Sequence, residues 1–332
     1  MTIDMHTHYA PQELVTELCR RNIPPFIKQN DDGTKIFHMP HGLLDFPISF
    51  TDMEERKRFM VAHKIDHQIL SFPGLFGVDS LATEESFPLI QIFNDQVSRL
   101  CREYPDSFSG IASLPMADIN LAVEEYKRAR NELGLIGAIL PNNCFISEEH
   151  ANRVSPIFKA VQEIGGHIFI HPGRRPDEVP ESDIQSKPIF TDFVAERLAL
   201  SVQHNVSHCM VTLLFSKFLD AYPDISLHVA NLGGTLPMVI ERMDNVSLAR
   251  TPNAPLPSTR TNRFHVDCSS LGPRSLELAV AIFGANRIVL GTDCPIFSTE
   301  QSLHAIAMAN IKTSDKQLIL HDNAAELLSV YN

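Results

Sequence analysis

The fold of this chain is most constrained by a regular alternation of short apolar segments with helical ones. Several of the apolar segments are continuous runs of Val, Ile and Leu, which are typical of parallel strands buried on both faces. Eight strand candidates occur, with helical segments between them: residues 2–8, 65–72, 108–114, 136–140, 167–171, 225–230, 263–268 and 287–291. Eight strands that alternate with helices predict an α/β protein with a (β/α)₈ barrel.

The alternative for such a pattern is a doubly wound open sheet. No G-x-G-x-x-G sequence follows any early strand candidate, so the pattern favours the barrel. We expect a single domain over residues 1–332, because no long linker or short repeat divides the chain. Residues 30–50, after the first helix, are expected to form a small hairpin insertion, since a turn at 31–33 precedes alternating residues at 35–39. The insertion either covers a pocket mouth or is a plain surface excursion.

Composition excludes several classes of partner. The net charge of −12 argues against nucleic acid, because phosphate binding needs concentrated Lys and Arg. No apolar run reaches the roughly 18 residues of a membrane span. The first strand candidate follows Met1 directly, which leaves no room for a signal peptide, and we expect a cytoplasmic protein. Six cysteines without paired spacing favour free thiols over a disulfide framework.

Candidate metal ligands lie at the ends of three predicted strands. His6 and His8, together with Asp4, alternate along the first strand and are expected on one face of it. His171 ends the fifth strand, and Asp293 follows the eighth. In a (β/α)₈ barrel the carboxyl ends of the strands form the active site. Three imidazoles and a carboxylate there predict a site for one divalent metal ion, zinc or a similar metal, with an open position for water or substrate. Singly, His171 could instead bond to backbone, and Asp293 could cap the following segment.

The sixth strand offers two further candidates, His228 and Asn231. They are three positions apart, so in a regular strand they point to opposite faces. Asn231 stands beside the Gly233-Gly234 turn and is expected to face the site. His228 is then expected to face the surrounding helices.

Taken together, these segments resemble the amidohydrolase superfamily, in particular the branch of aminocarboxymuconate-semialdehyde decarboxylase and related metal-dependent aromatic decarboxylases. The resemblance runs along nearly the whole chain. It rests on Ile3-Asp4-Met5-His6-Thr7-His8, on residues 110–116 and 121–125, on Phe169-Ile170-His171-Pro172, on Leu232-Gly233-Gly234 and on residues 288–297. It is specific for superfamily and fold and weak for substrate.

The resemblance implies a set of site residues. His6, His8, His171 and Asp293 would be the metal ligands, with zinc expected first and manganese second. Arg56 and Arg242 would hold carboxylate groups of the substrate, because a guanidinium fork suits a planar carboxylate. In the relatives the position of Arg242 reaches the partner subunit's site, which implies a homodimer. The plainer alternatives are a solvated Arg56 in a charged helix and a surface salt bridge for Arg242.

One departure from the family bears on mechanism. Relatives of the decarboxylase type carry His-x-Gly-Gly where this chain has Asn231-Leu232-Gly233-Gly234. An amide cannot relay a proton near pH 7, although it can hydrogen-bond a substrate oxygen. Asp293 is then the expected acid or base, with Asn231 assisting.

These observations predict a non-oxidative decarboxylase that acts on a small cyclic or aromatic carboxylic acid. Phe297 is expected in the apolar wall of its substrate site, unless it is ordinary core. The alternative on the same metal centre is a hydrolase or hydratase that attacks an amide, a lactone or a carbon–carbon double bond through metal-activated water. A barrel that only binds a small acid or a protein remains a third interpretation.

Overall fold

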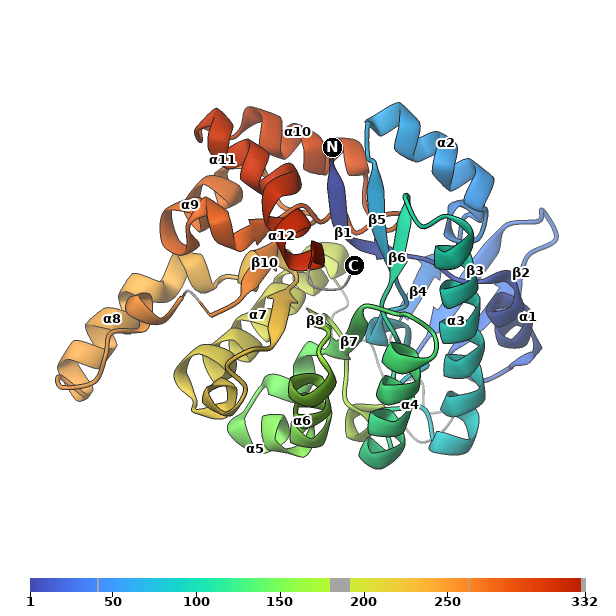
Figure 1. The fold of residues 1–332 in the computed structure, drawn as a ribbon, viewed down its shortest axis with the longest axis horizontal. Coiled ribbons are helices and arrows are strands. Elements are labelled where there is room, and N and C mark those ends of the chain that lie inside the picture. Colours follow the sequence, from blue (N-terminus) through green and yellow to red (C-terminus); the bar gives the residue numbers. More distant parts are fainter. Residues whose placement is uncertain (41, 180–191, 262, 330–332) are drawn as a thin grey trace.

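The computed structural model describes residues 1–40, 42–179, 192–261 and 263–329. Figure 1 shows an α/β fold in which helices surround the strands, so the α/β part of the predicted fold class is confirmed. Within the described residues, no helix is long and apolar enough to cross a membrane.

Within the described part of the chain, eight parallel strands form two sheets. One sheet has the order β1-β5-β6, with β1 at Ile3–His8, β5 at His67–Ser71 and β6 at Phe108–Gly110. The other has the order β11-β10-β9-β8-β7. Its strands are β7 (Gly137–Pro141), β8 (His167–His171), β9 (Ser226–Val229), β10 (His265–Asp267) and β11 (Ile288–Val289).

Short parallel links join the two sheets at both edges. Ala112, just beyond β6, forms a bridge with Ala138 of β7. Thr7 of β1 forms a bridge with Cys294, just beyond β11, and the Met5 amide donates to Leu290 O at 2.9 Å. The order of the eight strands is therefore cyclic, and their carboxyl ends meet around one rim.

Helices cover the outer face of the strands. They are α1 (Gln12–Arg20), α2 (Met53–His63), α3 (Thr83–Glu103), α4 (Ile119–Asn131), α5 (Glu148–Arg153), α6 (Ser155–Ile164), α7 (Val194–Phe215), α8 (Leu236–Arg250), α9 (Pro273–Phe283), α10 (Thr299–Met308), α11 (Thr313–Gln317) and α12 (Asn323–Ser329). Asp52 caps α2 by accepting a hydrogen bond from the Glu55 amide, and Asp118 caps α4 by accepting from the amides of residues 120 and 121.

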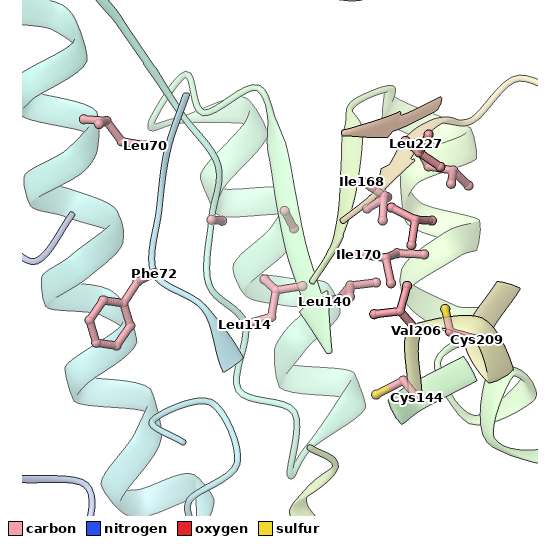
Figure 2. Close-up of a cluster of buried hydrophobic side chains, with 14 of the residues drawn as sticks. Leu70, Phe72, Leu114, Leu140, Cys144, Ile168, Ile170, Val206, Cys209 and Leu227 are labelled. Carbon is pink, nitrogen blue, oxygen red and sulfur yellow. The ribbon is translucent and has the colours of Figure 1, made fainter. Parts of the chain in front are cut away.

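Successive residues of a buried strand belong to different parts of the core. Figure 2 shows Ile168 and Ile170 of β8 in one cluster with Val206 and Cys209 of α7. Phe169, between the two isoleucines, belongs to a second cluster made mainly by the strands. This alternation explains the continuous apolar runs, since one face of each strand meets helices and the other meets strands.

The segment between α1 and α2 is a three-stranded antiparallel sheet. Its strands are β2 (Phe26–Gln29), β3 (Lys35–Met39) and β4 (Gly42–Asp45), in that order. The sequence predicts only a hairpin at 30–50, of which residue 41 lies outside the described residues; β2 was missed because it is short and has no clear alternation. The Phe37 ring of β3 lies 5.0 Å from that of Phe76, which follows β5. The inserted sheet therefore packs against a loop at the carboxyl ends of the strands.

Candidate metal centre

Four side chains from separate strand ends converge on one point. The ligand atoms of His6 and His8 on β1, His171 on β8 and Asp293 after β11 all lie within 4.8 Å of one another, and all four residues are buried. His8 Nε2 lies 3.0 Å from Asp293 Oδ1 and 3.2 Å from His6 Nε2. The structure therefore brings together the four residues that were predicted from their positions at the ends of strands.

The second ring nitrogen of each histidine meets a hydrogen-bond acceptor. His6 Nδ1 lies 2.9 Å from Asp267 Oδ2, and His171 Nδ1 lies 2.8 Å from the carbonyl oxygen of Pro172. His8 Nδ1 lies 2.9 Å from Ser71 Oγ, whose proton is donated to the Thr7 carbonyl. Each Nδ1 therefore carries the proton in the neutral ring, and each Nε2 presents its lone pair to the common point.

This donor set fits a divalent cation. Three imidazole nitrogens and one carboxylate oxygen are ligands that zinc and its neighbours accept. Asp293 Oδ1 is buried and has no hydrogen-bond partner among the described residues, although two imidazole nitrogens lie 3.0 and 3.5 Å away. A cation would compensate this buried charge and use lone pairs that otherwise face one another.

Burial and ion pairing oppose each other in the protonation of the four groups. Burial lowers the pKa of His8 and of His171, so both rings are neutral. Burial also disfavours a charged His6, but the carboxylates of Asp267 and Asp293 outweigh it and raise the pKa of His6 to about 10. Burial would raise the pKa of Asp293, yet the charge of His6 and its contacts with both histidines hold that pKa well below its usual value. A bound cation would take the place of the proton on His6 Nε2.

Asp4 does not join this group, so the prediction that it shares a face with both histidines is wrong. The pairing of β1 with β5 shifts register between Asp4 and Thr7, which interrupts the strict alternation. The Asp4 carboxylate instead accepts from the amide of Thr292 at 3.0 Å and from its hydroxyl at 2.7 Å. Asp4 thereby ties β1 to the segment that carries Asp293.

Asp267, at the end of β10, is a site residue that the sequence analysis missed. Its Oδ2 accepts from His6, and its Oδ1 accepts from the amides of Asn231 and Ser269 at 3.1 and 3.0 Å. Burial would raise the pKa of Asp267, but the charge and hydrogen bond of His6 lower it to about 2. The sequence could have indicated Asp267, because it stands at the carboxyl end of the seventh strand, and His171 was chosen for the same kind of position.

The prediction that His228 faces the helices is also wrong. His228 is fully buried, and its ring stacks on Phe169 with 4.1 Å between centroids. Phe169 in turn contacts the ring of His6 at 4.8 Å. His228 Nε2 lies 3.7 Å from Asp267 Oδ2. The side chain therefore lies on the inner side of the strands, next to Phe169 and Asp267, which both contact His6.

Asn231 also lies beside Asp267, because strand parity does not extend to it. Strand β9 ends at Val229, and Asn231 has a positive φ of 59° in the turn that follows. The alternation of side chains therefore stops before this residue is reached. The Asn231 side chain accepts a hydrogen bond from the hydroxyl of Ser269 at 2.6 Å.

Arg56 is buried rather than solvated, with 3% of its surface exposed. One terminal nitrogen donates to the carbonyl oxygens of His8 and Ser49, and the other donates to Gln68 Oε1 at 3.1 Å. Its Nε has no hydrogen-bond partner among the described residues. The guanidinium thus holds the backbone of the strand that carries His8.

Arg242 and Phe297 lie farther out. Arg242 is exposed on α8, which extends away from the ring of strands in Figure 1. Phe297 is half-exposed, and its amide donates to the Asp293 carbonyl at 3.2 Å. It lines a hollow of about 510 Å³ together with residues 270–273 and others between 298 and 305. This hollow lies beside the segments that carry Ser269 and Asp293.

The chain is similar to known proteins over most of its length. The 2-amino-3-carboxymuconate-6-semialdehyde decarboxylase of Dictyostelium discoideum is 26% identical over 277 residues, 80% of this chain and 73% of that protein. The gamma-resorcylate decarboxylase of Rhizobium radiobacter is 24% identical over 309 residues, 88% of this chain and 90% of that protein. The 5-carboxyvanillate decarboxylase of Novosphingobium aromaticivorans, solved with manganese and 4-hydroxy-3-methoxy-5-nitrobenzoic acid, superposes with a TM-score of 0.76 at 19% identity, covering 99% of this chain and 96% of that one. The family model described as "Amidohydrolase" matches residues 3–330, and the chain belongs to this family.

Proposed function

We propose that this protein is a metal-dependent, non-oxidative decarboxylase of a small aromatic or cyclic carboxylic acid. The convergence of three Nε2 lone pairs and the Asp293 carboxylate is the observation that carries the proposal. The relatives described above are decarboxylases, which favours decarboxylation over the hydrolase or hydratase alternative. The cyclic strand order supports a (β/α)₈ barrel with this group at its catalytic rim.

The four ligands would be His6, His8, His171 and Asp293, holding one zinc or, as in the solved relative, one manganese ion. When bound, the ion supplies a Lewis acid that orients and polarises the substrate. Asp293 accepts the proton of a substrate hydroxyl and returns it to the ring carbon that bears the carboxylate. The carbon–carbon bond then breaks, its electron pair restores the ring, and CO₂ leaves.

Other residues have supporting roles in this proposal. Asn231 uses its side-chain oxygen for Ser269, so its Nδ2 is the donor it offers to a substrate oxygen. Phe297 forms an apolar wall of the hollow beside Asp293. We assign Arg56 a positioning role, because it holds the backbone of His8 and of Ser49.

The exposed surface favours a homodimer. Helix α8 exposes the large apolar side chains of Met238 (79%) and Leu248 (55%) beside Arg242. Four more large apolar side chains are exposed at the start of α7: Phe193, which precedes the helix, and Val194, Leu198 and Leu200 within it. Large apolar patches left exposed on a soluble protein commonly mark an interaction surface. A second copy that covers α8 would bring Arg242 to the partner's site.

Elemental analysis combined with a CO₂-release assay tests the proposed activity. The purified protein should contain one divalent ion per chain, and a chelator should abolish CO₂ release from one of a set of hydroxybenzoates. Zinc or manganese should restore it. His171→Ala should lose both metal and turnover. Incorporation of ¹⁸O from solvent water into the product would show hydrolysis or hydration instead, and a protein that binds no metal would overturn the centre itself.

A further inference from the structure

A line of buried polar side chains leads inward from the metal centre. It starts at Asp267, which accepts from His6, and passes to His228, whose Nε2 lies 3.7 Å from Asp267 Oδ2. His228 Nδ1 lies 2.6 Å from His167 Nε2, and His167 Nδ1 lies 2.8 Å from the Ser226 hydroxyl. The line crosses the three adjacent strands β10, β9 and β8. The proposed mechanism uses neither histidine.

Two arrangements of protons satisfy the hydrogen bonds of this line, and the charge of Asp267 selects one of them. Burial lowers the pKa of His167 to about 3 and that of His228 well below its usual value, so both rings are neutral and each carries one proton. The N–H of His228 belongs on Nε2, beside the ionised carboxylate of Asp267. Its Nδ1 must then accept from His167 Nε2, and His167 Nδ1 must accept from Ser226. Every donor therefore points toward Asp267.

The last step is the one left incomplete. His228 Nε2 is buried and has no hydrogen-bond partner among the described residues, and 3.7 Å is too long for a hydrogen bond. A buried N–H without a partner is costly, so a purely structural histidine would be expected to find an acceptor. The charged atom nearest to His228 Nε2 is Asp267 Oδ2, which also accepts the hydrogen bond from His6 Nδ1. The dipole of His228 therefore acts on the carboxylate that orients a metal ligand.

We propose that His228, supported by His167, is a positioning residue of the metal centre: it holds the Asp267 carboxylate against His6 and so increases the affinity for the cation. The stack of His228 on Phe169, which also contacts His6, fixes the ring in place. The inference rests on the proposed metal centre. Loss of a group that orients a ligand in this way typically costs about 10–100-fold in metal affinity.

The test compares two substitutions of His228 in the full-length protein. His228→Phe keeps the ring stack and removes the N–H, and it should raise the dissociation constant for Zn²⁺ about tenfold in competition with a chromophoric chelator. His228→Gln can place an amide N–H where Nε2 lies, and it should restore most of the affinity. His67→Phe is the matched control. His67 is a buried strand histidine bonded to the Asp106 carbonyl and to Ser109, and its loss should leave zinc affinity unchanged.

Thermal unfolding of the metal-free proteins separates positioning from packing. If His228→Phe lowers the unfolding temperature but binds zinc as tightly as the wild type, the inference is wrong. If that variant does not fold, Ser226→Ala removes the first donor of the line. A weaker zinc affinity in Ser226→Ala then supports the inference, and an unchanged one overturns it. A wild-type protein that binds no zinc or manganese would instead refute the metal centre.

Discussion

At the scale of single residues, the three histidines of the proposed metal centre differ in the group that accepts the hydrogen bond from Nδ1. His8 has a hydroxyl, His171 has a carbonyl, and His6 alone has a carboxylate, Asp267. A charged acceptor makes the imidazole more basic than a neutral one does, which agrees with the opposite pKa shifts of His6 and His8. Of the three proposed ligands, His6 is therefore the one whose affinity for a cation we expect to depend most on its hydrogen-bond partner.

Asn231→His tests whether the turn after β9 lies next to the bound substrate. Histidine tolerates the positive φ of 59° better than most residues, so the turn should persist. The new imidazole would add a group that titrates between about pH 5 and 8, and we expect a new ionisation in the pH profile of kcat. Metal content, measured in parallel, should stay that of the wild type. A rate and pH profile identical to those of the wild type would place Asn231 away from the substrate.

Asp79 predicts a pH dependence of stability. Burial raises its pKa from 3.8 to about 7. Between these values the unfolded chain has lost a proton that the folded chain keeps, so the stability of the fold falls as pH rises from about 4 to 7, by at most about 4 kcal/mol. Asp79→Asn removes the titrating carboxyl and with it this decrease in stability. The free energy of unfolding of the variant should therefore exceed that of the wild type, and by more at pH 8 than at pH 5.

Urea unfolding at the two pH values measures the difference. Asp31→Asn, at an exposed position, is the control and should change stability by less than about 0.5 kcal/mol at either pH. A gap between Asp79→Asn and the wild type that does not widen with pH would contradict the assignment.

These residues also show what could be predicted from the sequence. The four residues of the proposed metal centre could be selected because the alternation of strands and helices fixes their positions at strand ends, and the structure places them together. Both wrong predictions assumed that side chains alternate regularly between the two faces of a strand. For Asp4, a register shift in β1 interrupts this alternation. For His228, the alternation could not be counted back from Asn231, because β9 ends at Val229. Asp267 was missed although its position follows the same rule.

At the scale of elements, β7 and β8 approach each other more closely than side chains allow. Gly137 pairs with His167, and a Cβ atom on Gly137 would lie 1.8 Å from the His167 carbonyl oxygen. Glycine is needed here for close approach of two backbones rather than for an unusual φ. The strand that begins with His167 ends with His171, so this pairing helps to position a residue of the proposed metal centre.

Gly137→Ala should therefore force β7 away from β8. We expect a loss of about 1–3 kcal/mol in the free energy of unfolding by urea, together with weaker metal binding through the displacement of β8. Gly272→Ala, at a position where a Cβ meets nothing within 4 Å, is the matched control and should cost no more than about 1 kcal/mol. Equal stability of the two variants would show that the strands can separate without cost.

At the scale of the whole molecule, Arg242 and the four proposed metal ligands lie in different surroundings. Arg242 is exposed on α8, whereas the four ligands are buried at the rim of the strands. The family resemblance predicts that this arginine serves the partner's site, a role that no single chain can display. The sequence supplied this expectation, and the exposed apolar face of α8 is the structural feature that agrees with it.

Mixed dimers test this arrangement directly. Arg242→Ala should lose most of its turnover and keep its metal, whereas His171→Ala should lose both, so each homodimer is inactive. In a dimer that contains one protomer of each kind, both defects fall on one site if Arg242 acts across a twofold interface. The other site is then intact.

Random pairing of the two variants makes about half of the dimers mixed, so co-expression should restore about a quarter of the wild-type activity. Sedimentation velocity should show dimers in every preparation. Met238→Lys, which places a charge on the exposed face of α8, should yield monomers that retain metal but not turnover. Mixed preparations that remain inactive although dimers form would show that Arg242 acts within its own chain or not at all.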